Sequence, residues 1–304
     1  MSISLSQSVT FPFDVTEDRI RFQQNIVDGK KGYYDMIEKR FISLETLESL
    51  INHLKPELEF QISSLNDPPV IQCINRIRRN LSLFQKNLRD SYSQVFLKYV
   101  SNRFLRSLPT QDIPSAILYV DIVGSTRLAT NLSSEELSKL IRIFSQEMSI
   151  IISKYGGFVL KYAGDAVIGY FPDLKDQGNV AENAVRCGHS MKIITNAINI
   201  AFQDFGLPPI SIRVGIDFGK NQIVFLGPEP DLIGHVITIA SKILPLAKPN
   251  QIAIGEGAYQ ILSEDLKKKF VITNQDDKRW NHINPETGKV YPVFFSKNED
   301  VNVN

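Results

Sequence analysis

SAILYVDI, residues 115–122, is an apolar run whose second-to-last residue, Asp121, is acidic. The apolar runs FVLKY (158–162) and AVIGYF (166–171) follow it further along the chain. Short runs of this kind, rich in β-branched and aromatic residues, predict buried strands. Ala163-Gly164-Asp165 separates the second run from the third, and its residue types predict a tight hairpin. The sequence therefore predicts a sheet that contains the strand 115–122 and the hairpin 158–171.

Amphipathic segments separate these strands and follow them. Ser133 or Ser134 with Glu136 predicts the start of a helix whose apolar face extends to Ile152, and Gly156-Gly157 predicts its end. Beyond it we predict a long helix over about 180–205, strands at 210–216 and 222–227 with Gly219 at the turn between them, a helix over 234–246, a strand at 251–255, a short helix near 257–270, and strands at about 270–273 and 290–296. The order β-α-β-β-α-β predicts an α+β fold, a ferredoxin-like βαββαβ sheet with extra C-terminal strands that two helices cover on one face.

The chain before residue 111 has a different pattern. A length of 304 residues favours about two domains, and the two prolines within 107–114 predict a linker. We therefore assign 1–110 to a helical N-terminal region and 111–304 to a second domain. Apolar residues at helical spacing within 68–110 predict one or two amphipathic helices whose basic residues form a solvated face, and 44–60 predicts another helix. The first 35 residues show no sustained period.

Composition excludes several classes of protein. Lys and Arg number 34 against 33 Asp and Glu, so the net charge of +1 argues against nucleic-acid binding. Cys73 and Cys187 cannot form a disulfide framework and are too far apart for a CxxC motif. The sequence has no run of about 18 apolar residues that would span a membrane, and its first residues lack the features of a signal peptide. These observations predict a cytoplasmic protein.

Two aspartates are candidates for chemistry. Asp121 lies at the end of a buried strand, and Asp165 lies in the hairpin turn. Two such carboxylates on neighbouring strands predict a hard-oxygen site for Mg²⁺ or Mn²⁺, although each alone is also explained as a cap or an ordinary turn residue. Gly124, Ser125 and Thr126 follow the first strand and open helix-forming sequence, so their backbone N–H groups are candidates for holding an anion.

Four blocks of sequence occur in order between residues 115 and 296. They are YVDIVGST (119–126), GGFVLKYAGDAVIGYF (156–171), RVGIDFGK (213–220) and DLIGHVITIASKI (231–243). Together they resemble the catalytic domain of the class III nucleotidyl cyclases, the adenylate and guanylate cyclases. The resemblance implies that Asp121 and Asp165, with the carbonyl of Ile122, bind two divalent ions that activate the ribose 3′-hydroxyl and hold the triphosphate.

The resemblance further implies that Lys161 and Asp231 select the base. Lys can donate to ring N1 of adenine and Asp can accept from its amino group, whereas guanine needs the reverse polarity, so ATP is predicted over GTP. Members of the family usually carry Asn and Arg where this chain has Thr238 and Lys242, two positions that serve catalysis, which puts the rate in question. Two more lysines are assigned to the triphosphate, Lys220 and Lys289.

We therefore predict a homodimeric adenylate cyclase that converts ATP to 3′,5′-cyclic AMP and pyrophosphate with two divalent cations, its sites lying at the subunit interface. Two alternatives stay open: a catalytically weak nucleotide-binding regulatory module of the same fold, and a cyclase for another nucleotide, GTP or a pyrimidine. The segment 70–106 is a candidate dimerising or signal-transmitting element, and packing on its own catalytic domain is equally open. A regulatory ligand or partner of 1–110 is not identified by the sequence.

Overall fold

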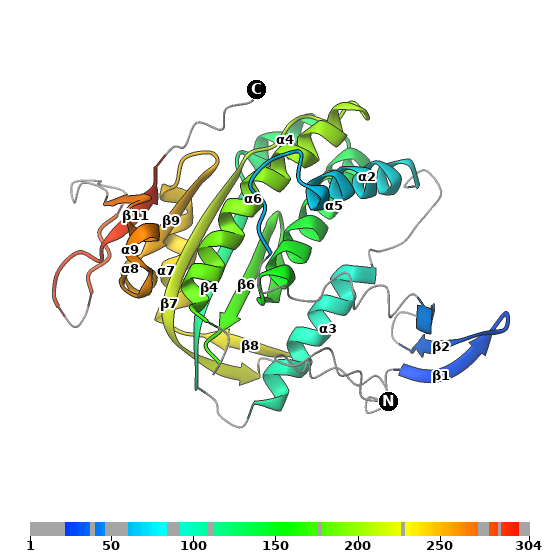
Figure 1. The fold of residues 1–304 in the computed structure, drawn as a ribbon, viewed down its shortest axis with the longest axis horizontal. Coiled ribbons are helices and arrows are strands. Elements are labelled where there is room, and N and C mark those ends of the chain that lie inside the picture. Colours follow the sequence, from blue (N-terminus) through cyan, green and yellow to red (C-terminus); the bar gives the residue numbers. More distant parts are fainter. Residues whose placement is uncertain are drawn as a thin grey trace.

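The computed structural model describes residues 22–36, 40–45, 60–83, 92–108, 112–174, 178–225, 229–272, 280–284 and 287–297. Its centre is an eight-stranded sheet in the order β10-β11-β9-β7-β4-β6-β5, with β8 paired to β7 (Figure 1). The strands of this sheet are β4 (Asp112–Ile122), β5 (Phe158–Ala163), β6 (Ala166–Pro172), β7 (Ile212–Phe225), β8 (Pro230–Ile233), β9 (Gln251–Gly255), β10 (Phe270–Ile272) and β11 (Val293–Ser296). A separate three-stranded antiparallel sheet contains β1 (Phe22–Val27), β2 (Lys30–Asp35) and β3 (Arg40–Ser43).

The helices are α2 (Pro68–Leu83), α3 (Tyr92–Ser107), α4 (Ser125–Asn131), α5 (Ser134–Lys154), α6 (Val180–Gln203), α7 (His235–Ile243) with a 3-10 turn at Leu244–Leu246, α8 (Glu256–Ile261) and α9 (Glu264–Lys267). The predicted βαββαβ unit is confirmed as β4-α5-β5-β6-α6-β7, with the first and third strands at its centre. The predicted cap is also confirmed, because Ser133 and Glu136 form a capping box at the start of α5. In the part of the chain that the structure describes, no helix has the length and apolarity needed to cross a membrane.

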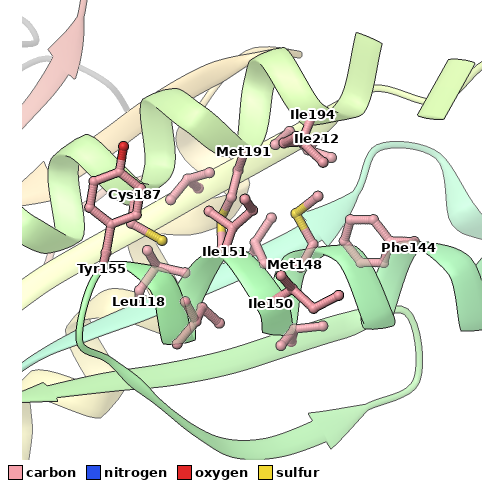
Figure 2. Close-up of a cluster of buried hydrophobic side chains, with 14 of the residues drawn as sticks. Leu118, Phe144, Met148, Ile150, Ile151, Tyr155, Cys187, Met191, Ile194 and Ile212 are labelled. Atoms are coloured by element: carbon pink, nitrogen blue, oxygen red, sulfur yellow. The ribbon is translucent and has the colours of Figure 1, made fainter. Parts of the chain in front are cut away.

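Helices α5 and α6 cover one face of the sheet. Figure 2 shows Met148 and Ile151 of α5 beside Met191 of α6, with Leu118 of β4 in the same cluster. All four side chains are buried. This layer is the main core of the protein, and it is the two-helix cover that the sequence predicts.

The opposite face is also covered, which corrects the prediction of helices on one face only. Helix α3 packs there, and the ring of its Phe104 stacks on Phe158 of β5 with 4.4 Å between centroids. Val236 and Ala240 of α7 belong to the same apolar cluster. The βαββαβ pattern does not predict this second helical layer, because α3 precedes the unit in the chain and α7 follows it.

Strand β7 corrects the prediction of two strands joined at Gly219. It is one strand of 14 residues, and its antiparallel pairing with β4 continues through Gly219. A Cβ atom at Gly215 would lie 2.4 Å from the carbonyl oxygen of Ala240, and one at Gly219 would lie 2.8 Å from Val236 Cγ2. These glycines therefore allow α7 to approach the strand closely, and they do not mark a turn.

The predicted linker over 107–114 is shorter than expected. Strand β4 begins at Asp112 and includes Pro114, which pairs with Lys220 on the β7 side. The β4–β6 pairing starts only at Ser115, so Pro114 has a strand on one side alone, a position that a proline tolerates. The predicted helix over 257–270 is two short helices, α8 and α9, and β8 was not predicted.

The N-terminal region is not only helical. Where the sequence predicts one or two helices within 68–110, the structure has two, α2 and α3, but β1 to β3 form a sheet where no regular structure was expected. Most of the helix predicted at 44–60, and the proposed domain boundary near residue 110, lie outside the described residues. Buried residues of α2 pack into the core of α5 and α6, so its apolar face is used within the chain.

A buried ion pair fixes α2 to the sheet-covering helices. The guanidinium of Arg76 binds both carboxylate oxygens of Glu147 on α5, whose side chain is only 1% exposed. The thiol of Cys73 also donates to Glu147, at 3.2 Å. One carboxylate therefore holds two groups of α2.

We expect Glu147→Ala to lower the free energy of unfolding by about 3–5 kcal/mol, because it removes the carboxylate that neutralises the partly buried charge of Arg76. Glu135→Ala, which breaks the pair between an exposed glutamate and Lys139 on the same helix, should cost about 0–1 kcal/mol. Denaturant titration of both variants measures the difference. Equal losses would contradict an anchoring role for Glu147.

Candidate active site

Asp121 and Asp165 lie at the same end of neighbouring strands. Val120 of β4 pairs with Val167 of β6, which places Asp121 just beyond the last residue pair and Asp165 in the turn that precedes β6. Gly164 makes that turn with a φ of 64°. Both aspartates are half-buried. The chain therefore brings two carboxylates to one edge of the sheet.

Arg213, which the sequence analysis left without a role, holds Asp121. It is paired with Asp121 across β4 and β7, and its guanidinium donates to both carboxylate oxygens, with Nε–Oδ1 at 3.1 Å and Nη2–Oδ2 at 2.7 Å. A bidentate pair fixes the direction of the carboxylate as well as offsetting its charge. Arg213 is the first residue of the block RVGIDFGK, but its contact with Asp121 could be predicted only from the register between β4 and β7.

The donor set at this edge suits a hard divalent cation. Two carboxylates supply oxygen ligands of the kind that Mg²⁺ and Mn²⁺ prefer. Among the described residues there is no group of three or more His, Cys, Asp or Glu side chains that could hold a metal ion. Two carboxylates leave coordination positions for water and phosphate oxygens, which is how Mg²⁺ is usually bound beside a nucleotide. The residues present therefore fit the expected ions.

Lys161 and Asp231 are brought into direct contact. The Nζ of Lys161 lies 2.6 Å from Oδ2 of Asp231. A β-bulge between Val159 and Lys161 shifts the register of β5, so Lys161 pairs with Ile168 and shares the face that α3 covers. The two side chains are 42% and 22% exposed, so the pair remains accessible to a ligand.

Two further side chains, those of Tyr119 and Lys98, lie near this pair, and neither was predicted from the sequence. Burial raises the pKa of the Tyr119 hydroxyl, and the charge of Asp231 raises it further. The Nζ of Lys98, on α3, donates to the carbonyl of Leu160 and lies 3.6 Å from a carboxylate oxygen of Glu229. Burial lowers the pKa of Lys98, while the charges of Glu229 and Asp231 act in the opposite direction. Lys98 is therefore part of this site and not of a solvated face.

Thr238 and Lys242 lie one turn apart on α7, and both are exposed. The Thr238 hydroxyl is 3.5 Å from the carbonyl of Gly234 at the start of the helix. Their common face is open to a ligand or to another subunit.

The remaining predicted phosphate contacts are scattered in a single chain. Gly124 has a φ of 72° and precedes α4, so it turns the chain from β4 into Ser125 and Thr126 beside Asp121. Lys220 lies seven residues along β7 from Arg213, about 23 Å away, and pairs with Asp112. Lys289 is exposed in a C-terminal turn. Within one chain, Lys220 is therefore not brought to the two carboxylates.

Comparison with known proteins identifies the family. The family model for the "Adenylate and Guanylate cyclase catalytic domain" matches residues 109–290. This chain belongs to that family. It is a class III nucleotidyl cyclase in its fold and its sequence, as the four blocks predict.

The relatives of this cyclase differ in the nucleotide by which they are named. A cytidylate cyclase from Staphylococcus aureus is 31% identical over 163 residues, which is 50% of this chain and 38% of that protein. A cytidylate cyclase from Escherichia coli is 22% identical over 299 residues, 94% of this chain and 62% of that protein. The crystal structure of the adenylyl cyclase CyaB from P. aeruginosa is 25% identical, with a TM-score of 0.54 over 65% of this chain and all of that chain. The cyclase chain spans less than two thirds of the length of both curated relatives.

Asp217 is a buried carboxylate of the cyclase sheet. Its oxygens accept hydrogen bonds from the backbone of Phe218 and Ala258 and from the hydroxyl of Tyr291. Burial nevertheless raises its pKa to about 7, because the hydrogen bonds only partly offset the loss of water. The residue ties β7 to the start of α8 and is distinct from the two carboxylates at the sheet edge.

We expect the stability of the protein to depend on the titration of Asp217. Its folded pKa lies above the unfolded value of about 3.9, so its stabilising contribution is complete below that value and is lost as the pH rises through about 7. Asp217→Asn cannot titrate, so the unfolding free energy of the native protein relative to this variant should fall between pH 5 and pH 8, by up to about 1.4 kcal/mol per pH unit. Denaturant titrations at both pH values measure this. Parallel pH curves would contradict it, and Asp265→Asn, at an exposed site, serves as the control.

Proposed function

We propose that this cyclase converts a nucleoside triphosphate whose base presents an amino group beside a ring-nitrogen acceptor on its Watson–Crick edge, ATP or CTP, to its 3′,5′-cyclic monophosphate and pyrophosphate. The observation that carries the proposal is the accessible ion pair between Lys161 and Asp231. An ammonium donor beside a carboxylate acceptor is complementary to a base edge on which a ring-nitrogen acceptor lies beside an amino donor.

Adenine and cytosine both present that edge. Adenine offers N1 and its 6-amino group, and cytosine offers N3 and its 4-amino group. Guanine and uracil instead present a carbonyl beside an N–H, so they would oppose a donor to a donor and an acceptor to an acceptor. A buried mismatch of this kind is strongly rejected, because the polar groups of the site lose their partners.

ATP is the substrate that the sequence predicts, and CTP is the second candidate. The Lys161–Asp231 pair by itself does not separate them, because the two edges are alike. The relatives support both, since the S. aureus and E. coli proteins are named cytidylate cyclases and the P. aeruginosa structure is named an adenylyl cyclase.

Asp121 and Asp165, with the carbonyl of Ile122, are the residues that would hold Mg²⁺ or Mn²⁺. When bound, such ions supply activation of the ribose 3′-hydroxyl and neutralise charge on the triphosphate. Arg213 orients Asp121 for this role through its bidentate hydrogen bonds. The backbone N–H groups at 124–126 are available to phosphate oxygens from the adjoining turn.

We propose a homodimer as the active form. Each chain carries both the carboxylate pair and the Lys161–Asp231 pair, so a two-fold axis would create two equivalent sites. Exposed Thr238 and Lys242 on α7 would stabilise charge on the phosphate there, and Lys220 and Lys289 would contact the triphosphate across such an interface. The division at residue 110, a cytoplasmic location and an input through 1–110 remain parts of this proposal.

The second candidate function is a nucleotide-binding module with weak catalysis. Thr238 and Lys242 favour it, because a hydroxyl and an ammonium replace the amide and guanidinium that the family usually presents at these positions. A preorganised donor contributes about 2.7–4 kcal/mol to lowering a barrier. Nucleotide binding without turnover would identify the module.

Asp121→Asn and Asp165→Asn should each lower turnover by about 100-fold or more while leaving the fold intact, because each removes an ionic ligand of the metals. The measurement is chromatographic detection of cyclic nucleotide from ATP, CTP, GTP and UTP with Mn²⁺. Asp173→Asn, an exposed site at the other end of β6, should retain full activity. Retained activity in either of the first two variants would refute the metal assignment.

The charge-reversed double variant Lys161→Glu with Asp231→Lys should favour GTP and UTP, because it keeps the ion pair and reverses the donor and the acceptor. We expect the ratio of kcat/KM for ATP or CTP to that for GTP or UTP to fall by about 100-fold or more. Reversing the Glu135–Lys139 pair on α5 is the matched control and should leave the ratio unchanged. An unchanged ratio in the Lys161 and Asp231 variant would refute base selection by this pair.

A further inference from the structure

Lys98 lies beside the proposed base-selecting pair, Lys161 and Asp231, and has no role in the reaction proposed above. Strand β8 pairs with β7, whereas β5 lies at the far edge of the sheet, yet Asp231 of β8 contacts Lys161 of β5. The β7–β8 segment therefore crosses the face that α3 covers, and Figure 1 shows β8 beginning near α3. Lys98 bridges the two strands, because it contacts the carbonyl of Leu160 on β5 and Glu229 just before β8.

Helix α3 holds Lys98 in this position. Its Phe104 stacks on Phe158, and its Ser101 lies 3.3 Å from the hydroxyl of buried Tyr170. The Lys98 side chain is 22% exposed, so its charge is only partly hydrated. An ammonium has three N–H donors, and the contacts described for Lys98 engage it through one carbonyl and one ion pair. At least one donor remains for a further acceptor.

We propose that Lys98 is a third base-selecting residue and that, with Lys161 and Asp231, it directs this cyclase toward CTP. The inference rests on the proposed function, since it assigns a further residue to the same base site. It also decides between the two substrates that the Lys161–Asp231 pair leaves equivalent.

The chemistry of the two bases separates them at one atom. Beyond the amino group and ring nitrogen that they share, cytosine presents the carbonyl oxygen O2, whereas adenine presents a C–H group at the corresponding position. A second ammonium matches the carbonyl and gains nothing from the C–H. With adenine bound, Lys98 would also lose water without gaining an acceptor, which is unfavourable for a partly buried charge. Two ammonium groups and one carboxylate therefore complement cytosine better than adenine.

The test compares Lys98→Met with Lys139→Met in the full chain. Both lysines are paired with a glutamate and are similarly buried, 22% and 19% exposed, but Lys139 lies on α5 away from the site. For Lys98→Met we expect kcat/KM for CTP to fall by about 10-fold to 100-fold, mainly through KM, as the loss of a charged hydrogen bond predicts. The value for ATP should change by less than about twofold. Lys139→Met should change neither nucleotide's value.

Lys98→Arg keeps a cation that can still contact the carbonyl of Leu160 and the carboxylate of Glu229, so it tests the same inference without detaching α3 from β5. It should retain the preference for CTP over ATP. Equal losses for CTP and ATP in Lys98→Met, with a lowered melting temperature, would show that Lys98 only attaches α3 and would overturn the inference. Native protein that cyclises ATP but not CTP would overturn the inference and leave the proposed function standing. Native protein that cyclises none of the four nucleotides would overturn the proposed function itself.

Discussion

The pairing of β4 on both sides is the constraint on which the rest of the structure depends. Its eleven residues pair with β7 over their whole length and with β6 over most of it. Asp121 must therefore emerge beside Arg213 on one neighbour and beside the hairpin turn of Asp165 on the other. A carboxylate at that point gains a bidentate partner and a second carboxylate close by, without any contribution from a flexible loop. The proposed metal-binding edge is thus a consequence of strand register.

The proposed base-selecting site depends on two departures from regular strand pairing. The bulge in β5 redirects Lys161 to the face that α3 covers, and β8 carries Asp231 across that face to meet it. Because α3 covers the same face, its Lys98 enters the site through ordinary helix packing. The surface proposed to select the nucleotide is therefore assembled from both parts of the chain, although the proposed metal-binding edge comes from the sheet alone.

The sequence predicts well what depends on neighbours in the chain. The apolar runs, the Ser133 capping box and the hairpin at Gly164 are local signals, and all three are confirmed. The turn predicted at Gly219 was wrong, because this glycine makes room for α7, a helix that follows later in the chain and packs against β7. Arg213 and Lys98 could not be assigned from the sequence, since the role of each depends on which residue lies opposite it in space. Local pattern indicates elements, whereas register and packing determine their contacts.

The basic stretch before residue 110 has a different meaning once its contacts are known. Arg76 is paired with buried Glu147, and Lys98 is paired with Glu229 near Lys161 and Asp231, so part of the local positive charge is used inside the protein. Helices α2 and α3 also bury apolar residues on opposite faces of the βαββαβ unit. Removing 1–110 would therefore expose both faces at once and would delete Lys98 together with its supporting helix. An inactive fragment that begins at residue 111 would consequently say little about a regulatory role of the N-terminal region, because the same cut removes part of the core and part of the proposed site.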